Sequence, residues 1–336
     1  MESPLWTDEY APAVADLPQP TVRDYLTEAA DEPINLVLFG PKGSGKTAAA
    51  RALAREAHED PDNDLVEINV ADFFDRTKKE IRSDPRFASF LEGRSSMSKR
   101  DMINHVLKES ASYQPVSGTY KTVLLDNAES IREDFQQALR RVMEQYAAST
   151  QFVVTTRQPS KLIPPIKSRC FPVPVRAPSH EETVDALERV VAAAGAEYDA
   201  EGLEYVAGYG GGDLRKAVLG AQTAYEGEGA VTMQTAYEAL GDIGDDDIIG
   251  EMLDAAEAGE FSEARSHLDD LVYDEGYSGE EILEDVLRVA RSRYEGRQLA
   301  ALYELAGDVD LALTESTSDR AQLGHLLAEL GASVDA

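Results

Sequence analysis

The chain has 336 residues, of which 43% are hydrophobic, and it carries a formal net charge of −31 from 63 acidic and 32 basic residues. This length and apolar content suffice for two or three domains with full cores. No apolar run approaches 18 residues and the acidic opening MESPLWTDEY lacks a signal-like apolar stretch, so we expect a cytoplasmic protein with no membrane partner.

The cysteine, histidine and lysine contents limit the metal sites and the partners that we expect. Cys170 is the only cysteine, which excludes an internal disulfide, and the five histidines show no ligand spacing, so Mg²⁺ is the only metal we expect. Lysine is scarce, with 10 Lys against 22 Arg, as is typical of a halophilic protein from a high-salt cytoplasm. At 1 M salt the Debye length is only about 3 Å, so the acidic charge does not exclude a nucleic-acid partner.

Short apolar runs in the first half of the chain predict strands buried on both faces. They cover residues 34–40, 64–70, 121–127, 150–156 and, more weakly, 170–176. Helical patterns at 47–58 and 133–147 alternate with them. This alternation predicts a doubly wound α/β domain with a parallel sheet. Residues 86–100 and 108–121 fit no regular pattern and are interpreted as an inserted loop and an irregular segment.

The segment GPKGSGKT follows the first apolar run and opens the first helical pattern. It matches the GxxxxGK[ST] phosphate loop in full and in the required context. Its backbone N–H groups can wrap phosphates, while Lys46 reaches the β- and γ-phosphates and the Thr47 hydroxyl ligates Mg²⁺. The predicted ATP-binding residues are Gly40, Pro41, Lys42, Gly43, Ser44, Gly45, Lys46 and Thr47.

Between the phosphate loop and the next strand, the chain has a locally basic window. Residues 76–121 carry 10 basic and 5 acidic residues, a net charge of +5. Lys78, Lys79 and Arg82 are spaced for one side of a helix. This window predicts a face that contacts DNA phosphates, with a solvated helix surface as the alternative.

The segment TVLLDNAES, residues 122–130, raises the question of hydrolysis. Asp126 ends a buried strand and suits a second Mg²⁺ contact. Asn127 occupies the position that usually holds a glutamate base, and asparagine cannot accept a proton from water. Losing a general base costs roughly 10²–10⁴ in rate. Glu129, two positions on, is an alternative base.

From residue 179 the pattern becomes wholly helical. Ser179 and Glu182 form a capping-box pattern, and Gly195 marks the end of the helix that they begin. The acidic, glycine-containing stretch at 241–247 reads as a linker. A separate bundle of about five helices is expected beyond it.

Taken together, these segments resemble the small subunits of replication factor C, the archaeal and eukaryotic sliding-clamp loader of the AAA+ class. The Ser-Arg-Cys and GDLRKA elements are specific, whereas the phosphate loop alone would not be. The resemblance runs from end to end, through PLWTDEYAP, GPKGSGKT, EINVAD, FQQALRRVMEQY, SKLIPPIKSRC, GGDLRKAV, GEFSEARSHLDDLVYDEGYSGEEIL and LTES with AQLGHLLAEL.

The resemblance implies an architecture and a set of partners. It implies an α/β AAA+ module, a parallel sheet with flanking helices, over residues 1–178, a small helical lid domain over 179–241, and an all-α collar for oligomerisation over 242–336. The partners would be other small subunits, the large subunit, the sliding clamp (PCNA) and primer–template DNA. ATP and Mg²⁺ would sit between neighbouring subunits.

The resemblance also assigns roles to particular residues. Arg169 of Ser-Arg-Cys would act in trans as an arginine finger, a contribution of roughly 10³–10⁵ in phosphoryl transfer. Arg215 matches sensor 2, which contacts the γ-phosphate in cis. Tyr10 and Pro12 would lie near the adenine. A solvated Arg169 and an ion pair between Arg215 and Asp213 are the alternatives.

Three positions depart from the family pattern. Asn127 replaces the usual glutamate, Arg157 replaces the sensor-1 asparagine that orients water, and Ala11 replaces an arginine in the opening. We therefore hypothesise a subunit that binds ATP–Mg²⁺, hydrolyses it weakly and donates Arg169. The alternatives are a competent ATPase subunit, a free-standing AAA+ remodeller with full turnover, and a scaffold without nucleotide, which the intact phosphate loop opposes.

Overall fold

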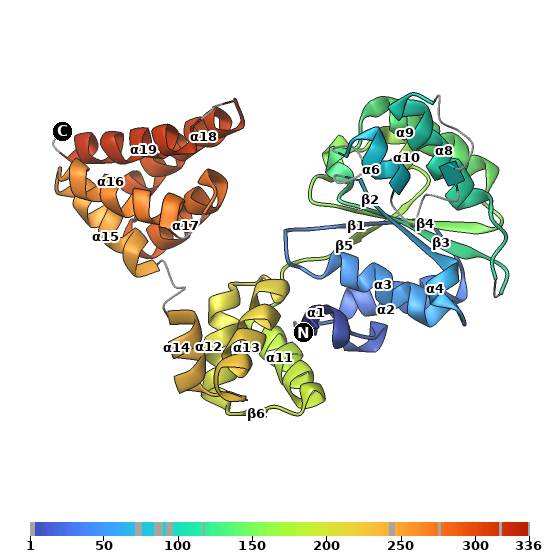
Figure 1. Ribbon diagram of the computed structural model, residues 1–336, viewed down its shortest axis with the longest axis horizontal. Helices are drawn as coiled ribbons and strands as arrows, with labels where there is room; N and C mark the ends of the chain where they lie inside the picture. The colour runs from blue at the N-terminus through green and yellow to red at the C-terminus, as the bar shows by residue number, and fades with distance from the viewer. Residues whose placement is uncertain are drawn as a thin grey trace. The chain divides into compact units, whose positions relative to one another are not determined.

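The computed structural model describes residues 4–70, 76–83, 90–91, 97–116, 118–241, 246–274, 277–315 and 318–334 (Figure 1). The chain forms two compact units, Met1–Ala239 and Leu240–Ala336. The first holds the phosphate loop, and each unit is described by itself.

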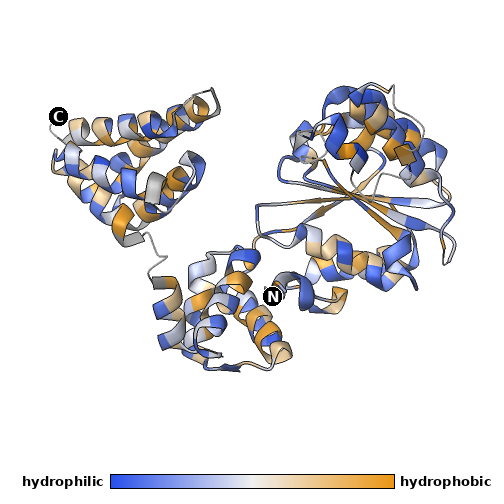
Figure 2. Cartoon of the chain, in the orientation of Figure 1, coloured by the Kyte–Doolittle hydropathy of each residue, from blue (hydrophilic) through white to orange (hydrophobic). Residues whose placement is uncertain are grey.

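A parallel five-stranded sheet forms the centre of the N-terminal unit. Its strand order is β2-β3-β4-β1-β5, and each neighbouring pair is parallel. The strands span Leu36–Phe39 (β1), Leu65–Asn69 (β2), Lys121–Asp126 (β3), Thr150–Thr156 (β4) and Phe171–Pro174 (β5). All five predicted strands are present, and hydrophobic residues gather along them in Figure 2. The edge strands β2 and β5 are not buried on both faces as expected, because most of their residues are partly or fully exposed. Because the strands are parallel, their carboxyl ends share one edge.

Helices cover both faces of this sheet (Figure 1). One face carries α2 (Pro20–Asp31), α3 (Lys46–Ala57) and α4 (Pro61–Asp64). The other carries α6 (Lys78–Ser83), α8 (Lys99–Ser112), α9 (Glu133–Gln145) and α10 (Pro164–Lys167). Short elements complete the unit: α1 (Trp6–Glu9), η1 (Val14–Asp16), η2 (Ala128–Ser130) and η3 (Pro159–Lys161). Among the described residues, no helix is long and apolar enough to span a bilayer.

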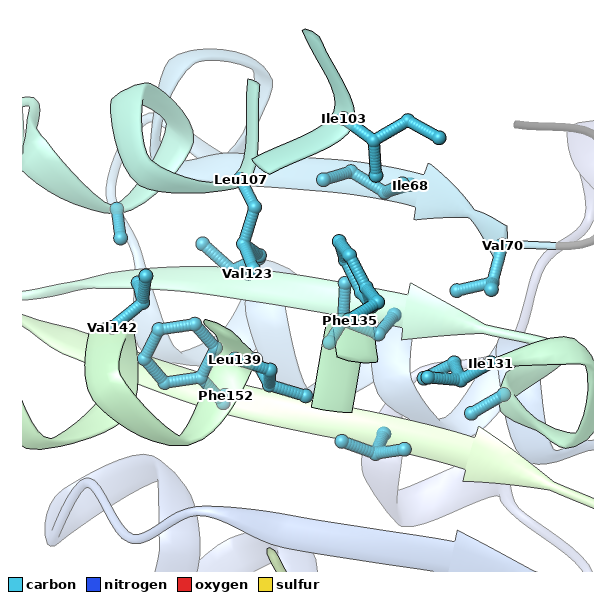
Figure 3. Packing of buried hydrophobic residues seen from close by; sticks show 14 of the residues in the cluster. Ile68, Val70, Ile103, Leu107, Val123, Ile131, Phe135, Leu139, Val142 and Phe152 are labelled. Carbon is cyan, nitrogen blue, oxygen red and sulfur yellow. The ribbon is translucent and has the colours of Figure 1, made fainter. Parts of the chain in front are cut away.

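Helices α8 and α9 pack on the sheet through one apolar cluster (Figure 3). Its labelled members from the two helices are Ile103, Leu107, Phe135, Leu139 and Val142. Burying each of these side chains contributes roughly 1.5–3 kcal/mol. A second cluster joins α2 and α3 to the opposite face.

Helix α8 corrects one expectation. Residues 108–112, interpreted as irregular, form its last turn, and the helix begins after the N-cap Ser98. Its buried Met102, Ile103, Val106 and Leu107 have helical spacing, but serine and charged residues between them obscure it. Most of the segment 86–100 lies outside the described residues.

A second correction concerns the region after residue 179, which is not wholly helical. Two short parallel strands, β6 (Glu197–Tyr198) and β7 (Ala230–Val231), pair with each other. Strands of two residues are too short to show a periodicity. The helices here are α11 (His180–Ala194), α12 (Ala200–Gly210), α13 (Leu214–Glu228) and α14 (Met233–Gly241). The capping box at Ser179 and Glu182 is confirmed, as is the left-handed C-cap at Gly195.

The C-terminal unit is a helical bundle with its own apolar core. Its described helices are α15 (Asp246–Glu257), α16 (Phe261–Asp269), α17 (Gly279–Arg293), α18 (Gly296–Glu315) and α19 (Asp319–Val334), with a π-helical turn, η4, at Asp270–Asp274. The expected bundle of about five helices is confirmed.

The first residue of β3, Lys121, is a buried cation. It is only 2% exposed, and its Nζ has no hydrogen-bond partner among the residues that the structure describes. The Nζ lies 5.3 Å from the ring centroid of Tyr113. Burial lowers the pKa of Lys121 to about 8, opposed only in part by Asp64.

We expect Lys121→Met to stabilise the protein at pH 7. A folded-state pKa below the unfolded value of 10.5 means that the protonated lysine opposes folding, so wild-type stability rises between about pH 8 and pH 10.5. Met removes this penalty, on the order of 1–3 kcal/mol, and its advantage should shrink as the pH approaches 10.5. Thermal unfolding at several pH values measures this, with exposed Lys108→Met as the control; a lower midpoint at pH 7 would contradict it.

Candidate nucleotide site

The phosphate loop has the backbone that its glycines predict. It runs from Gly40, directly after β1, to Lys46 at the start of α3. Gly43 and Gly45 have φ values of 70° and 93°, which favour glycine. Gly40 is required for a different reason, because a Cβ there would lie 1.9 Å from the carbonyl oxygen of Val175.

Gln19 links the phosphate loop to the segment that follows β5. Its Nε2 donates to the carbonyl oxygens of Ser44 (3.0 Å) and Arg176 (2.8 Å), and the residue is only 3% exposed. On the other side, the Gly40 N–H donates to the Thr156 carbonyl at 3.3 Å. Sequence reasoning missed Gln19, whose only signal is its position before Pro20 at the start of α2.

The first turn of α13 also contacts the loop. The Leu214 N–H donates to the Gly43 carbonyl at 3.0 Å. The Asp213 carboxylate caps α13 by accepting from the Lys216 N–H at 2.9 Å, and it lies against Gly43. Arg215 is the next residue after Leu214, so this exposed side chain begins close to the loop.

Lys46 lies along the loop that carries it. Its Nζ donates to the carbonyl oxygens of Gly40 (3.0 Å) and Pro41 (2.5 Å), and the residue is 9% exposed. Burial lowers the pKa of Lys46, while the charges of Glu129 and Asp126 oppose that shift. The lysine thus sits among carboxylates that favour its charged form. Neighbouring Lys42 is exposed.

Thr47 and Asp126 are brought together as predicted. The Thr47 Oγ1 donates to Asp126 Oδ1 at 2.8 Å, and Thr155 Oγ1 donates to the same oxygen. Asp126 ends β3 and is only 7% exposed. A hydroxyl beside a carboxylate is a hard oxygen set of the kind that Mg²⁺ accepts.

Asn127 has an unusual backbone. Its φ of 56° makes it the one non-glycine residue with a positive φ in the described part of the chain. Asparagine tolerates this conformation better than most residues. Its Nδ2 donates to Asn69 Oδ1 at a long 3.4 Å, and its backbone N–H donates to Thr155 Oγ1 at 3.2 Å. The side chain is thus directed to the end of β2.

Arg157 and Glu129 form an ion pair beside the loop. The Arg157 Nε donates to Glu129 Oε1 at 2.9 Å, and the Arg157 backbone N–H donates to Oε2 at 3.2 Å. Burial would raise the pKa of Glu129, but hydrogen bonds from Arg157, from its own backbone and from the Thr156 side chain together leave that pKa below its usual value. The sequence identified both residues as candidates but did not predict that they form an ion pair.

Arg169 lies at the opposite edge of the sheet. It precedes β5, whose first residue pairs in register with Leu36, the first residue of β1, whereas the phosphate loop follows the last residue of β1. A strand of four residues separates the two positions by roughly 13 Å. Arg169 Nη1 donates to the Pro165 carbonyl at 2.8 Å, and Nη2 pairs with Glu144. It is therefore an ion-paired side chain rather than a freely solvated one.

The opening segment lies between α3 and α13. The Trp6 N–H donates to Gln222 Oε1 at 2.8 Å, and the Trp6 ring packs on Tyr225 at 5.2 Å. Tyr10 meets Trp6 edge-on, with centroids 6.0 Å apart. Arg55 Nη2 donates to the Pro12 carbonyl at 2.8 Å. Pro12 is thus contacted by α3, and Tyr10 is contacted by Trp6, which α13 holds.

The predicted DNA-contacting residues Lys78, Lys79 and Arg82 all lie on α6. Lys78 and Lys79 are exposed, Arg82 is half-buried and Ile81 is buried. Other basic residues of the window, Arg86 and Arg94, lie outside the described residues.

Two family models match different parts of the chain. The model described as DNA polymerase III, delta subunit, matches residues 27–179. The model described as Replication factor C C-terminal domain matches residues 245–329.

Curated relatives match nearly the whole chain, and several carry the name replication factor C small subunit. The relative from Staphylothermus marinus is 30% identical over 335 residues, covering 97% of this chain and 94% of its own. The relative from Aeropyrum pernix is 32% identical, covering 97% and 95%. That from Sulfolobus acidocaldarius is 31% identical, covering 98% and 96%.

Solved structures match the fold at low identity. The Thermotoga maritima RuvB Holliday junction branch migration motor has a TM-score of 0.52 at 15% identity, covering 84% of this chain and 90% of that one. A point mutant of that protein has a TM-score of 0.55 at 15% identity, covering 82% and 91%. The predicted AAA+ fold is thereby confirmed.

We expect Gln19→Ala to loosen the phosphate loop, because it leaves two buried carbonyls without their donor. Each lost buried partner costs about 1–3 kcal/mol. We predict weaker ATP binding by about tenfold, measured by calorimetry, and a lower thermal midpoint. Gln158→Ala, on the surface after β4, is the control, and an unchanged ATP affinity in Gln19→Ala would contradict the role given to Gln19.

Proposed function

This chain belongs to the replication factor C small subunits, and we propose that it binds ATP and Mg²⁺ within a hetero-oligomeric clamp loader that places the sliding clamp on primed DNA. The observation that carries this proposal is the phosphate loop, fixed by Gln19 and by α13 beside the Thr47–Asp126 pair. The proposed partners of this chain are the large subunit, other small subunits, the sliding clamp and primer–template DNA.

The residues present fit ATP and Mg²⁺. Backbone N–H groups at the start of α3 and the Lys46 ammonium would hold the phosphates. Thr47 and Asp126 would hold the metal, whose positive charge would offset charge on the phosphate oxygens. Arg215 would contact the terminal phosphate from α13, and Tyr10 and Pro12 would lie beside the adenine.

Weak hydrolysis at this chain's own site is the second part of the proposal. Asn127 offers no basic oxygen, and both oxygens of Glu129 accept hydrogen bonds from Arg157. A carboxylate engaged in this way is a poor general base. The geometry therefore supports nucleotide holding over turnover, and it opposes rescue of the base by Glu129.

Donation of Arg169 to a neighbour is the third part. The position of Arg169 at the amino edge of the sheet keeps it from this chain's own phosphate loop. A role in phosphoryl transfer would therefore be performed on another subunit's nucleotide. Before that contact forms, Glu144 holds the guanidinium, and Arg140 pairs with Glu144 at 3.1 Å.

A free-standing AAA+ remodeller is the competing function. The match of the C-terminal unit to the replication factor C C-terminal domain favours the clamp loader. We propose the division into an AAA+ module at 1–178, a lid at 179–241 and a collar at 242–336 on the same grounds. The collar would join this chain to its partner subunits.

We predict that Arg169→Ala will lower the DNA-stimulated ATPase of the assembled complex at the neighbouring site by about 10³-fold or more, because it removes charge stabilisation in phosphoryl transfer. ATP binding by this chain should not change. Lys167→Ala removes the same charge two residues away and serves as the control. A complex with unchanged turnover would refute the finger.

We predict that replacing both Lys78 and Lys79 with Ala will weaken binding of the complex to primed DNA. Each lost phosphate contact should reduce the slope of log affinity against log salt by about 0.9. Exposed Lys161→Ala, on η3 and outside the basic window, is the control. An unaltered salt slope in the double variant would exclude α6 from the DNA contact.

A further inference from the structure

The Glu129–Arg157 pair lies next to the phosphate loop. The carbonyl of Thr156, one residue before Arg157, accepts the N–H of Gly40 at 3.3 Å. The charges that act on Lys46 include those of Glu129, Asp126 and Arg157. The pair therefore shares the electrostatic environment of the lysine that would meet the phosphates.

Glu129 holds Arg157 at two points. One carboxylate oxygen accepts from Nε and the other from the backbone N–H of the same residue. The Glu129 side chain is only 9% exposed, whereas that of Arg157 is 52% exposed. The carboxylate is thus fixed inside the protein, while the arginine reaches outward from it.

The guanidinium retains donors for a ligand. Within the described ranges, the side chain of Arg157 donates a hydrogen bond through Nε. A guanidinium anchored through Nε presents its two terminal nitrogens as a planar fork, the geometry that binds phosphate oxygens in pairs. Anchoring also reduces the rotamer entropy that a long side chain loses when it binds.

We propose that Glu129 is a positioning residue, which holds Arg157 as a second cation for the terminal phosphate of a nucleoside triphosphate. The site then prefers ATP to ADP and retains it. This inference rests on the proposed function, because it requires that nucleotide binds in the phosphate loop. It assigns Glu129 to holding an arginine rather than to activating water.

The test is the ratio of ATP to ADP affinity, measured by calorimetry on the full chain with Mg²⁺ in molar KCl. Arg157→Asn and Glu129→Gln should each lower this ratio by about tenfold, the size of one charge-assisted hydrogen bond. The double variant should lower it no further, because both substitutions remove one interaction. Additive losses, or a higher ratio in Glu129→Gln, would overturn the proposal.

Arg157→Lys separates position from charge. Lysine keeps the cation but cannot bind Glu129 through an Nε–H while presenting a fork, so the ratio should stay low. Recovery of the full wild-type ratio in Arg157→Lys would show that charge alone suffices and would overturn the positioning role. Arg288→Asn, which breaks a 2.7 Å pair with Asp285 in the C-terminal unit, is the matched control.

Two further outcomes separate this inference from the function on which it rests. If the wild-type chain binds no nucleotide, the proposed function fails. If it binds ATP and ADP equally, only the role of the pair fails. If Glu129→Gln abolishes slow hydrolysis and leaves the ratio unchanged, Glu129 is a base and the inference is wrong. Thermal unfolding without nucleotide checks that each variant is folded.

Discussion

The N-terminal unit depends on the parallel direction of all five strands of its sheet. The carboxyl ends of β1, β3 and β4 meet at one edge, which brings together the phosphate loop, the Asp126–Asn127 turn and Arg157. The same direction places Arg169, which precedes β5, at the other edge. Under the proposed function, nucleotide would bind at one edge and Arg169 would face a neighbouring subunit from the other.

Two positions at this edge, Asn127 and Arg157, depart from the family pattern expected from the sequence. A sensor-1 arginine without a partner would add an unbalanced cation near Lys46, and Glu129 supplies the partner. We propose that, with Glu129 so engaged, Asn127 leaves the site without an available base. One ion pair thus balances the charge of Arg157 and engages Glu129, the residue that could have replaced a base at position 127.

The sequence predicted local features well. The strands have near-continuous apolar runs, and the phosphate loop has a motif whose glycines are required by backbone angles and close contacts. The contacts that fix the site join distant segments and leave no periodic trace: Gln19 to Arg176, Asp213 to Gly43, and Glu144 to Arg169. Helix α8 and the strands β6 and β7 were missed because their patterns are obscured or too short. The halophilic origin stays a prediction from composition.

We propose that this subunit holds ATP and hydrolyses it only weakly. This proposal is tested most directly by single-turnover hydrolysis in an assembled complex whose other phosphate-loop lysines are replaced by alanine, compared with the same complex carrying Asn127→Glu. We predict that labelled ATP binds the wild-type subunit but is hydrolysed more slowly than in Asn127→Glu, by roughly 10²-fold or more. Equal rates in the two complexes would show that another group supplies the base and would contradict the account.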